Sequence, residues 1–384
     1  MAVRVVFVRS KSPAGLEPRI AKEAGTLSRA GFDVHAILWD RELAYPAEED
    51  RAGLRIHRFR LRAPEGQPAL AWLLPRWWAH VFFRILRLRP AVVHAIDFDT
   101  VVPAFAAARI AGARLVYDIF DFYAEMITAP LSPPLRRFLA KAEHRMIRRA
   151  DAIILPDLRR REQLGGVEPK RLVEIQNVPE DRGRPGREPA SDHFVVFYGG
   201  MIAKDRGLKD LVIACEDTGA RLVVAGHGPD EAELANVIES SHAAIFLGTI
   251  SYDEVLDQTA GCQVVAALYD PAVPNNRFAA PNKLFEAMMF EKPVLVSEGT
   301  LAADIVREVG CGIVVPYGDR EALKRALEKL MLSSEEASAM GARGRAAFGQ
   351  RYNWKAMEPI LLQLYREELQ ANAPRESRLL SVNP

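Results

Sequence analysis

A lysine and a glutamate three residues apart, Lys283 and Glu286, are the pair best suited to binding chemistry in this sequence. Their spacing places both side chains on one face of a helix start. Pro281 and Asn282 precede them and set that start at a helix N-terminus. There a cation can meet a phosphate while a carboxylate accepts hydrogen bonds from sugar hydroxyls. The alternative is an ordinary surface ion pair, worth well under about 1 kcal/mol.

A glycine turn is a second candidate for anion binding. Gly199 and Gly200 follow the apolar run 194–198, and Lys204 and Arg206 come just before the next predicted helix. Glycines let backbone amides approach a phosphate at the positive end of that helix, and either cation adds a formal charge. Glycine turns between strand and helix are also common for purely structural reasons, so the pattern alone leaves both interpretations open.

Buried strands that alternate with helices must position these residues. Runs rich in Val and Ile predict strands at 3–8, 34–38, 91–95, 114–118 and 152–156, and again at 194–198, 221–225, 244–247, 263–268, 293–296 and 312–315. Segments of helical period, such as 19–29, 253–259 and 320–331, separate them. Such near-continuous apolar runs are typical of parallel strands covered on both faces. We predict an α/β fold of two facing Rossmann-like, doubly wound parallel-sheet domains with a cleft between them.

The length of 384 residues also favours two domains of similar size. A segment rich in Pro, Gly and charged residues, 179–193, predicts a linker. The predicted parts are an N-terminal acceptor domain at 1–178, a C-terminal donor domain at 194–350, a C-terminal helix at 351–370 that packs back on the first domain, and a loose tail at 371–384.

Charge divides unequally between the two halves. Up to residue 182 there are 30 Lys and Arg against 22 Asp and Glu, and after it 21 against 28, so the halves carry about +8 and −7. A basic half suits an anionic partner, either nucleic acid or an anionic membrane. Three cysteines without a CxxC spacing predict neither a disulfide frame nor a zinc site. The first residues predict a buried strand rather than a secretory leader, so we expect a cytoplasmic protein.

Two basic segments of the first half favour the membrane. Residues 69–89 carry three of the five tryptophans, with arginines that make a spanning helix unsuitable. An interfacial helix would offer Trp72, Trp77, Trp78, Phe82 and Phe83 to the headgroup boundary and Arg76, Arg84, Arg87 and Arg89 to phosphates; the alternative is a core helix. Residues 136–149 repeat cations at helical spacing, as a membrane-facing or a solvated helix face would. Nucleic acid is not predicted, because no nucleic-acid-binding motif accompanies the charge.

The segment Pro281-Asn-Lys-Leu-Phe-Glu-Ala-Met288, followed by Lys292-Pro-Val294, resembles the donor site of family-4 glycosyltransferases, which are retaining enzymes of the B-type fold. Other motifs agree in order along residues 3 to about 365. They are Glu17-Pro-Arg19 with Glu23, His94-Ala-Ile-Asp97, Asp118-Ile-Phe-Asp121 with Glu125, Asn177-Val-Pro179, Gly226-His-Gly-Pro229 and Leu247-Gly248.

The resemblance implies a role for each matching residue. Glu286 would bind the nucleotide ribose, Lys283 and Arg206 would contact the donor diphosphate, and His94 would stand near the reacting sugar, so that His94, Arg206 and Lys283 form the catalytic set. The remaining donor-binding residues would be Gly199, Gly200, Lys204, Gly226 and Asn282. The acceptor-side residues would be Arg19, Asp97, Asp121 and Glu125. His94 also has a structural interpretation, as a hydrogen-bonded wall of the sheet.

The sequence departs from the family pattern at two positions. The first glutamate of the usual pair is Phe278, so the contact to the donor sugar's hydroxyl must come from elsewhere, such as Asn282 or backbone amides. The arginine that many members carry after the first glycine is Met201, which puts more weight on Lys204, Arg206 and Lys283. Asp97-Phe-Asp99 also spells the manganese-binding Asp-x-Asp of A-type glycosyltransferases, but these aspartates are better explained by capping a helix or orienting the acceptor.

We therefore expect a metal-independent hexosyltransferase without cofactor that takes a UDP- or GDP-linked sugar and passes it, with retention, to a glycan or lipid-linked acceptor. It would work at the inner face of the membrane as a peripheral protein. Two alternatives stay open: a non-catalytic partner subunit that binds a nucleotide sugar, and a nucleotide-sugar epimerase of the same fold, for which Asp97, Asp121 and Glu125 would supply the carboxylates.

Overall fold

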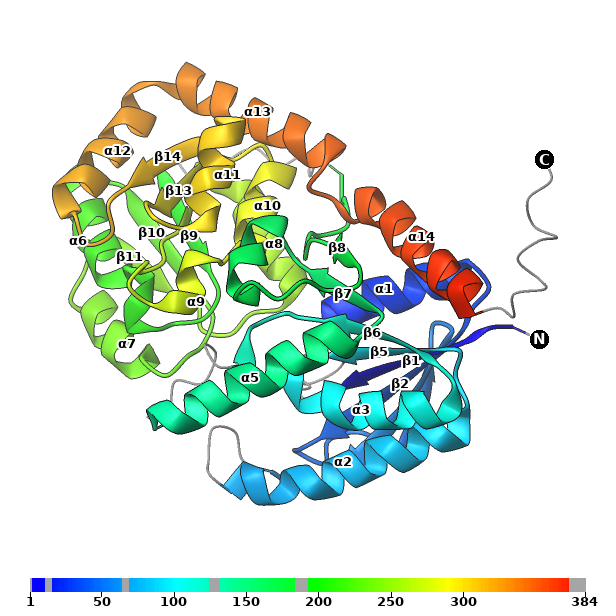
Figure 1. Ribbon diagram of the computed structural model, residues 1–384. Coiled ribbons are helices and arrows are strands. Elements are labelled where there is room, and N and C mark those ends of the chain that lie inside the picture. Colours follow the sequence, from blue (N-terminus) through cyan, green and yellow to red (C-terminus); the bar gives the residue numbers. More distant parts are fainter. Residues whose placement is uncertain (1, 11–15, 64–68, 124–131, 184–192, 373–384) are drawn as a thin grey trace, which may run out of the picture. The chain divides into compact units, whose positions relative to one another are not determined.

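The computed structural model describes residues 2–10, 16–63, 69–123, 132–183 and 193–372, with the backbone alone at 69–71 and 372. The chain divides into two compact units, residues 1–177 together with 357–384 (unit 1) and residues 178–356 (unit 2). Both are α/β layers (Figure 1). Glu125, part of the predicted linker and the predicted tail lie outside the described residues.

Unit 1 is built on a sheet of order β3-β4-β2-β1-β5-β6-β7-β8. Its strands are β1 (Arg4–Arg9), β2 (Asp33–Asp40), β3 (Glu48–Arg51), β4 (Leu54–Arg60), β5 (Val92–Ile96), β6 (Arg114–Asp118), β7 (Ala152–Leu155) and β8 (Leu172–Glu174). All neighbours pair in parallel except β3 and β4, which form an antiparallel hairpin. Its helices are α1 (Pro18–Arg29), α2 (Ala69–Leu88), α3 (Phe98–Ala111), α5 (Pro133–Arg149), the short η1 (Leu158–Leu164) and α14 (Trp354–Asn372).

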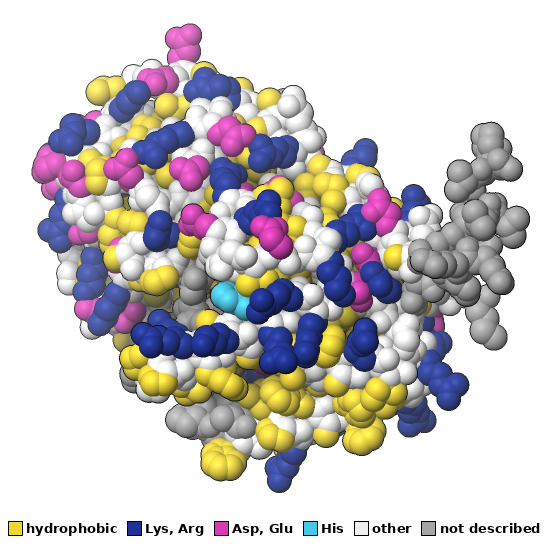
Figure 2. All heavy atoms as spheres, in the orientation of Figure 1, with side chains coloured by type: hydrophobic (Ala, Val, Ile, Leu, Met, Phe, Trp, Pro, Cys, Tyr) yellow, Lys and Arg dark blue, Asp and Glu magenta, His cyan; other side chains and the backbone are white. Residues whose placement is uncertain are grey.

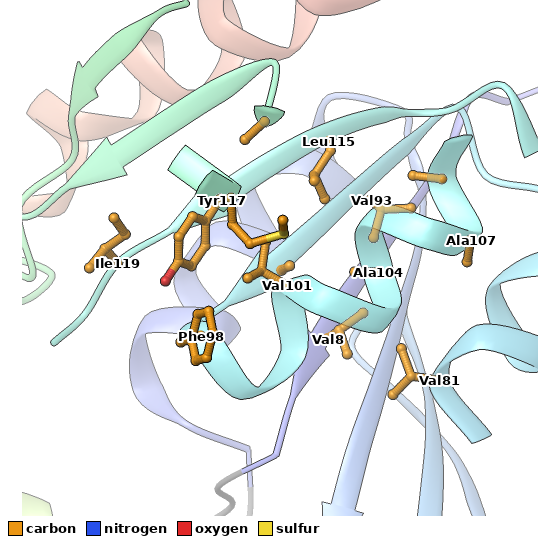
Figure 3. Close-up of a cluster of buried hydrophobic side chains, with 14 of the residues drawn as sticks. Val8, Val81, Val93, Phe98, Val101, Ala104, Ala107, Leu115, Tyr117 and Ile119 are labelled. Carbon is orange, nitrogen blue, oxygen red and sulfur yellow. The ribbon is translucent and has the colours of Figure 1, made fainter. Parts of the chain in front are cut away.

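Alternate residues of the central strands point to opposite faces of this sheet. Val93 faces the core shared with α2, α3 and α5, which Figure 3 shows around Val8, Val101 and Tyr117. His94 points to the other face, where its ring stacks on Phe7 and meets α14. The sheet is therefore covered on both faces, as its apolar strands predict.

Unit 2 is a six-stranded, all-parallel sheet of order β11-β10-β9-β12-β13-β14. The strands are β9 (Val195–Gly199), β10 (Arg221–Ala225), β11 (Ala244–Phe246), β12 (Val264–Ala267), β13 (Val294–Ser297) and β14 (Gly312–Val315). The helices are η2 (Lys204–Arg206), α6 (Leu208–Thr218), α7 (Glu231–Glu239), α8 (Tyr252–Gly261), α9 (Pro274–Arg277), α10 (Asn282–Met289), α11 (Leu301–Val309), α12 (Arg320–Leu332) and α13 (Ser334–Gln350). The strand order reverses between β9 and β12, and ligands of such sheets bind outside the carboxyl ends at this point.

The prediction of two α/β domains with parallel sheets is confirmed. Predicted strands 114–118, 221–225 and 312–315 coincide with β6, β10 and β14, and the other predicted strands end within two residues of the observed bounds. The hairpin β3–β4 and the edge strand β8 were not predicted. Their segments, Glu-Glu-Asp-Arg in β3 and Leu-Arg-Ile-His-Arg-Phe-Arg in β4, carry charges that hide the apolar run.

Two histidines lie against each other inside unit 1. Nδ1 of His35 in β2 is 2.9 Å from Nε2 of His57 in β4. Asp33 contacts His35, and Arg84 and Glu48 contact His57 on its other side. Burial, assisted by Arg84, lowers the pKa of His57 to about 4, and burial also lowers the pKa of His35. Both imidazoles are therefore neutral at neutral pH.

We expect this histidine pair to make unit 1 sensitive to acid. An unfolded histidine takes up a proton near pH 6.5, whereas folded His57 resists protonation down to about pH 4. Stability should therefore fall as pH drops from 6.5 to 4, by on the order of 2 kcal/mol. Denaturant unfolding at pH 7.5, 6, 5 and 4 measures it. His57→Gln should flatten the decline, and the exposed His242→Gln should not; equal slopes in all three proteins would contradict this account.

Candidate functional site

The N-terminus of α10 carries the two residues that the sequence singles out. Pro281 occupies the N-cap position, and Lys283 and Glu286 are both buried, with 7% and 4% of their surface exposed. Because a buried pair is not an ordinary surface ion pair, that alternative is wrong for these residues. No ion pair joins them among the described contacts, so each must be understood from its own surroundings.

The ammonium of Lys283 lies among tyrosine rings and glycine backbone. Its Nζ is 3.5 Å from the ring centroid of Tyr198 and 5.7 Å from that of Tyr269. A Cβ added at Gly200 would stand 3.0 Å from this Nζ. Nζ has no hydrogen-bond partner among the described residues. Burial, and then the charge of Arg206, lowers the pKa of Lys283 to about 7. The site therefore holds a cation poised to gain an anionic partner.

Arg206 stands next to this lysine and is fixed by two polar neighbours. Its Nη1 is 2.5 Å from the carboxylate of Asp205 and 3.2 Å from Oδ1 of Asn276. Its guanidinium also covers the ring of Tyr269 at 4.3 Å. The ring of Tyr269 therefore lies close to both cations. We call Tyr198, Arg206, Tyr269 and Lys283 the cation–tyrosine cluster.

Glu286 has a partner on α8. The hydroxyl of Tyr252, the first residue of that helix, lies close to the Glu286 carboxylate. Burial, and then the Glu286 charge, raises the pKa of Tyr252 above its usual value. The carboxylate is thus held as an acceptor at the site, as a residue that binds hydroxyl groups must be.

Two glycines bring the loops after β9 and β10 into direct backbone contact. A Cβ at Gly226 would lie 1.8 Å from the carbonyl oxygen of Gly200, and one at Gly228 would lie 2.0 Å from that of Ile202. Gly200 N donates to Ala225 O at 2.9 Å. Gly199 is constrained by the ring of Phe197 instead. These glycines therefore have a structural role, and the same packing presents the Gly200 backbone to Lys283.

Replacing Gly226 by alanine should disturb both the fold and the site. The methyl group would meet the Gly200 carbonyl, and Gly226 has a φ of +137° that L-residues rarely adopt. We expect a loss of about 3 kcal/mol in unfolding free energy, within the range for overpacked backbone positions. Gly219→Ala is the control, because Gly219 has a φ of +76° but no atom within 4 Å of its Cβ position. Equal losses in the two variants would refute the contact argument.

Lys204 and Asn282 lie apart from the cation–tyrosine cluster in their contacts. Lys204 is exposed and its ammonium pairs with Asp230 and Glu233 at the start of α7. It lines a separate cavity of about 270 Å³ with Tyr317 and Arg320. Asn282, the first residue of α10, is exposed. The donor-binding roles of both residues remain predictions.

His94 and Arg19 belong to the interior of unit 1. Arg19 Nη2 is 2.9 Å from both oxygens of Asp118, and its Nε is 3.0 Å from Glu23. His94 Nδ1 is 2.7 Å from the hydroxyl of Tyr365 in α14. Both side chains are almost fully buried. His94 therefore occupies a hydrogen-bonded position in the sheet, in line with the structural interpretation that the sequence left open, while its catalytic role and the acceptor-side role of Arg19 stay predictions.

Asp97 directly follows β5 in a strained conformation, with a φ of 62°. It occupies the N-cap position of α3 but makes no side-chain cap there, so the capping prediction is wrong. Its carboxylate instead pairs with Arg9 and accepts from the backbone amides of Phe120 and Asp121. Asp99 hydrogen-bonds to Ser10. Both carboxylates thus hold the loops at the carboxyl ends of β1 and β6, and Asp121 is half-exposed beside them.

Comparison with known protein families assigns both halves of the chain. The glycosyl transferase 4-like domain family matches residues 14–177. The glycosyl transferases group 1 family matches residues 180–347. The two glycosyl transferase families together account for residues 14–177 and 180–347, so the chain belongs to the glycosyltransferases. The cation–tyrosine cluster and α10 lie inside the group 1 region of this glycosyltransferase.

The names of two curated relatives of this glycosyltransferase refer to glycan synthesis. It is 24% identical over 196 residues to the capsular polysaccharide biosynthesis glycosyltransferase CapM of Staphylococcus aureus, covering 46% of this chain and 48% of CapM. It is 25% identical over 206 residues to the O-antigen chain mannosyltransferase C of Escherichia coli, covering 52% of this chain and 54% of that protein. The match spans about half the length of each relative.

Solved structures confirm the B-type fold of the glycosyltransferase. Sucrose-phosphate synthase of Thermosynechococcus elongatus superposes with a TM-score of 0.80 at 17% identity, over 96% of this chain and 100% of that one. HepE of Anabaena in complex with UDP gives 0.72 at 17% identity, over 95% and 100%. Within the described residues, the glycosyltransferase has no helix long and apolar enough to span a bilayer.

The aromatic and amide parts of this candidate site were not predicted from the sequence. Tyr198, Tyr269, Asn276 and Tyr252 were not predicted, although they fix the two cations and Glu286. Tyr198 stands directly before the glycine turn and Tyr269 directly after Leu268 at the end of a predicted strand. The sequence did carry a signal for these residues. A tyrosine stands at the carboxyl end of β9 and another just after β12, the two strands between which the strand order reverses.

Proposed function

We propose that this protein transfers a sugar from a nucleoside-diphosphate sugar, bound by unit 2, to an acceptor on the side of unit 1. The observation that carries the proposal is Lys283 at the N-terminus of α10, a buried ammonium beside Arg206 and the Gly200 backbone that has no hydrogen-bond partner in the described part of the chain. Two neighbouring cations at a helix N-terminus suit a diphosphate.

The reaction breaks the bond between the anomeric carbon and the diphosphate and forms a bond from the acceptor oxygen to that carbon. Negative charge grows on the leaving diphosphate, where Lys283, Arg206 and the α10 dipole would stabilise it by about 3 kcal/mol or more per well-placed group. No metal ion is required by this arrangement. For a transfer with retention, the acceptor attacks from the leaving-group face and its proton passes to a phosphate oxygen.

The donor nucleotide is proposed to be UDP or GDP, and the sugar a hexose. Support comes from HepE, whose structure holds UDP, and from the mannosyltransferase named above. The ribose hydroxyls would take the place of the Tyr252 hydroxyl and donate hydrogen bonds to Glu286. The half-buried Phe278 leaves no carboxylate at its position, so the sugar hydroxyl contact would fall to Asn282 or to backbone amides.

The acceptor is proposed to be a glycan or a lipid-linked sugar. The names of the curated relatives, for capsular polysaccharide and O-antigen chains, support a growing surface glycan. A lipid-linked acceptor would place the protein at the inner face of the membrane, with the exposed side chains of segments 69–89 and 136–149 toward the lipid.

A panel of nucleotide sugars tests the proposal directly. The wild-type protein is incubated with UDP- and GDP-linked hexoses, and both the rise in melting temperature and the release of free nucleotide are measured. We expect one nucleotide to stabilise unit 2 and Lys283→Met to remove that shift. Stabilisation without transfer to any acceptor would favour the non-catalytic partner, and a change in sugar configuration without transfer would favour an epimerase. No shift with any member would overturn the donor site.

A further inference from the structure

Three helices of unit 1 cover one face of the sheet, and the sides of these helices that point away from the sheet face solvent. α2, α3 and α5 each connect parallel strands in the same direction along the sheet, so all three cover the same face (Figure 1). One apolar core holds them there, through Val81 of α2, Val101 of α3 and Ile147 of α5. We call their solvent side the α2–α3–α5 face.

This face has cations but no exposed carboxylate. α2 contains no Asp or Glu, Asp99 of α3 is hydrogen-bonded to Ser10, and Glu143 of α5 is buried and accepts from Tyr117. The exposed cations of the three helices are Arg76, Arg87, Arg109, Arg136, Arg137, Lys141, Arg145, Arg148 and Arg149. Figure 2 shows dark blue side chains in a row along α5. Nothing on these helices neutralises them, so the face attracts an anionic surface.

Large apolar side chains stand exposed among these cations. Trp72 is 84% exposed and Phe83 is 68% exposed on α2, Ile110 is 68% exposed on α3, and Phe138 is 66% exposed on α5 beside Leu135. Figure 2 shows yellow side chains next to the basic row. The predicted interfacial role of the whole 69–89 segment is thus corrected: Trp77 is fully buried, Trp78 and Phe82 pack on the core, and Arg84 pairs with Glu48.

Three of the exposed apolar side chains also lie near the carboxyl edge of the sheet. In parallel units the helices run opposite to the strands, so the first turns of α2 and α5 lie at the carboxyl edge. Trp72 is in the first turns of α2, and Leu135 and Phe138 are in those of α5. The loops that hold Asp97 and Asp121 lie at the same edge. Contact with a membrane there would bring the acceptor-side residues to the lipid surface.

We propose that the α2–α3–α5 face docks on an anionic lipid bilayer, with Trp72, Leu135 and Phe138 entering the headgroup layer. Charge complementarity and exposed aromatic side chains on an otherwise cationic helix layer are the features of interfacial binding. A nucleic acid would use the cations but would gain nothing from Ile110 and Leu135. The proposal rests on the proposed function only in that the acceptor is lipid-linked.

Vesicle binding tests the face without any sugar donor. The full-length protein is floated with two kinds of vesicle. One kind contains phosphatidylcholine alone, and the other also contains phosphatidylglycerol as about one third of its lipid, which gives it an anionic surface. We expect binding only to the anionic vesicles, a loss at high salt, and a blue shift of tryptophan fluorescence that is reduced in Trp72→Phe. Arg136→Ala with Arg137→Ala should weaken binding about 30-fold, and Phe138→Glu should abolish insertion.

Matched variants on unit 2 distinguish binding through the α2–α3–α5 face from nonspecific binding of the protein to vesicles. Leu332 is 88% exposed at the end of α12, and Arg325 on the same helix is exposed. Leu332→Glu and Arg325→Ala should leave vesicle binding unchanged. Four results would each overturn the proposal. The first two are no binding to any vesicle and equal binding to neutral and anionic vesicles. The other two are control variants that weaken binding as much as the variants of the α2–α3–α5 face, and RNA that displaces the protein from anionic vesicles. The nucleotide-induced rise in melting temperature is measured in parallel: it is expected in every docking variant, and its absence would count against the proposed function, not the docking face.

Discussion

Replacing Lys283 by methionine should reduce sugar transfer by at least about 100-fold while leaving the protein folded. Methionine keeps most of the side-chain volume between Tyr198 and Tyr269 but removes the ammonium that would meet the diphosphate. A buried ammonium without a counter-ion costs stability, so the ligand-free variant should melt at or above the wild-type temperature. Release of nucleotide from the donor and a thermal melt measure the two effects.

The control for this prediction is Lys204→Met. Lys204 is a cation of the same glycine turn, but it is exposed and pairs with α7. We expect transfer to change by less than about threefold, as for an exposed cation of small energetic weight. If Lys204→Met proves as damaging as Lys283→Met, the diphosphate is bound nearer to α7 and the assignment of the cation–tyrosine cluster is wrong.

Donor binding should weaken as pH rises above 7. Burial and Arg206 lower the pKa of Lys283 to about 7 in the free protein, so the ammonium loses its proton there. A bound diphosphate favours the charged form and raises this pKa again. The affinity for a nucleotide sugar should therefore be flat below pH 7 and fall by up to about tenfold per pH unit above it. Titration calorimetry from pH 6 to 9 checks this, since the diphosphate diester of a nucleotide sugar does not titrate in that range.

Lys283→Arg supplies the control, because a guanidinium keeps its charge throughout the range. Its affinity should not depend on pH, whatever its absolute value. The ligand-free wild-type protein should change in the opposite sense. An unfolded lysine keeps its proton up to about pH 10.5, so unit 2 should gain stability as pH rises from 7 toward that value. A wild-type affinity independent of pH would show that Lys283 is charged without a ligand.

The strands and the α10 site could be predicted because their signals are local. Apolar runs of four to six residues mark β5 or β13, and Pro281 with Lys283 marks a helix start. Burial of Lys283 could not be predicted, since it depends on Tyr198 and Tyr269, which come from two other strand ends. The surroundings of a charged side chain are set by tertiary contacts that no local spacing encodes.

The contacts of His94 are a second example of surroundings that the sequence could not predict. The motif of His94 placed it at a strand end, yet the residue lies one pleat further in, and the alternation of a β-strand turns its ring to the face covered by α14. Its partner Tyr365 follows 271 residues later. Helical periodicity divides α2 in a comparable way: the sequence left a core helix and an interfacial helix open, and in the structure Trp77 faces the core while Trp72 faces solvent. In both cases the surroundings of the residue depend on the face of the strand or helix from which its side chain projects.

The return of α14 to unit 1 has a consequence for how such proteins can be recombined. The backbone leaves unit 1 after residue 177 and re-enters it at 357, so unit 2 is topologically a single inserted block. Tyr365 and Glu368 of α14 hydrogen-bond to His94 and Arg114, and a fragment that stops at 178 forfeits those bonds. A chimaera with junctions at 178 and 356 keeps them all. Unit 2 can thus be exchanged as one continuous block while every hydrogen bond of α14 within unit 1 is kept.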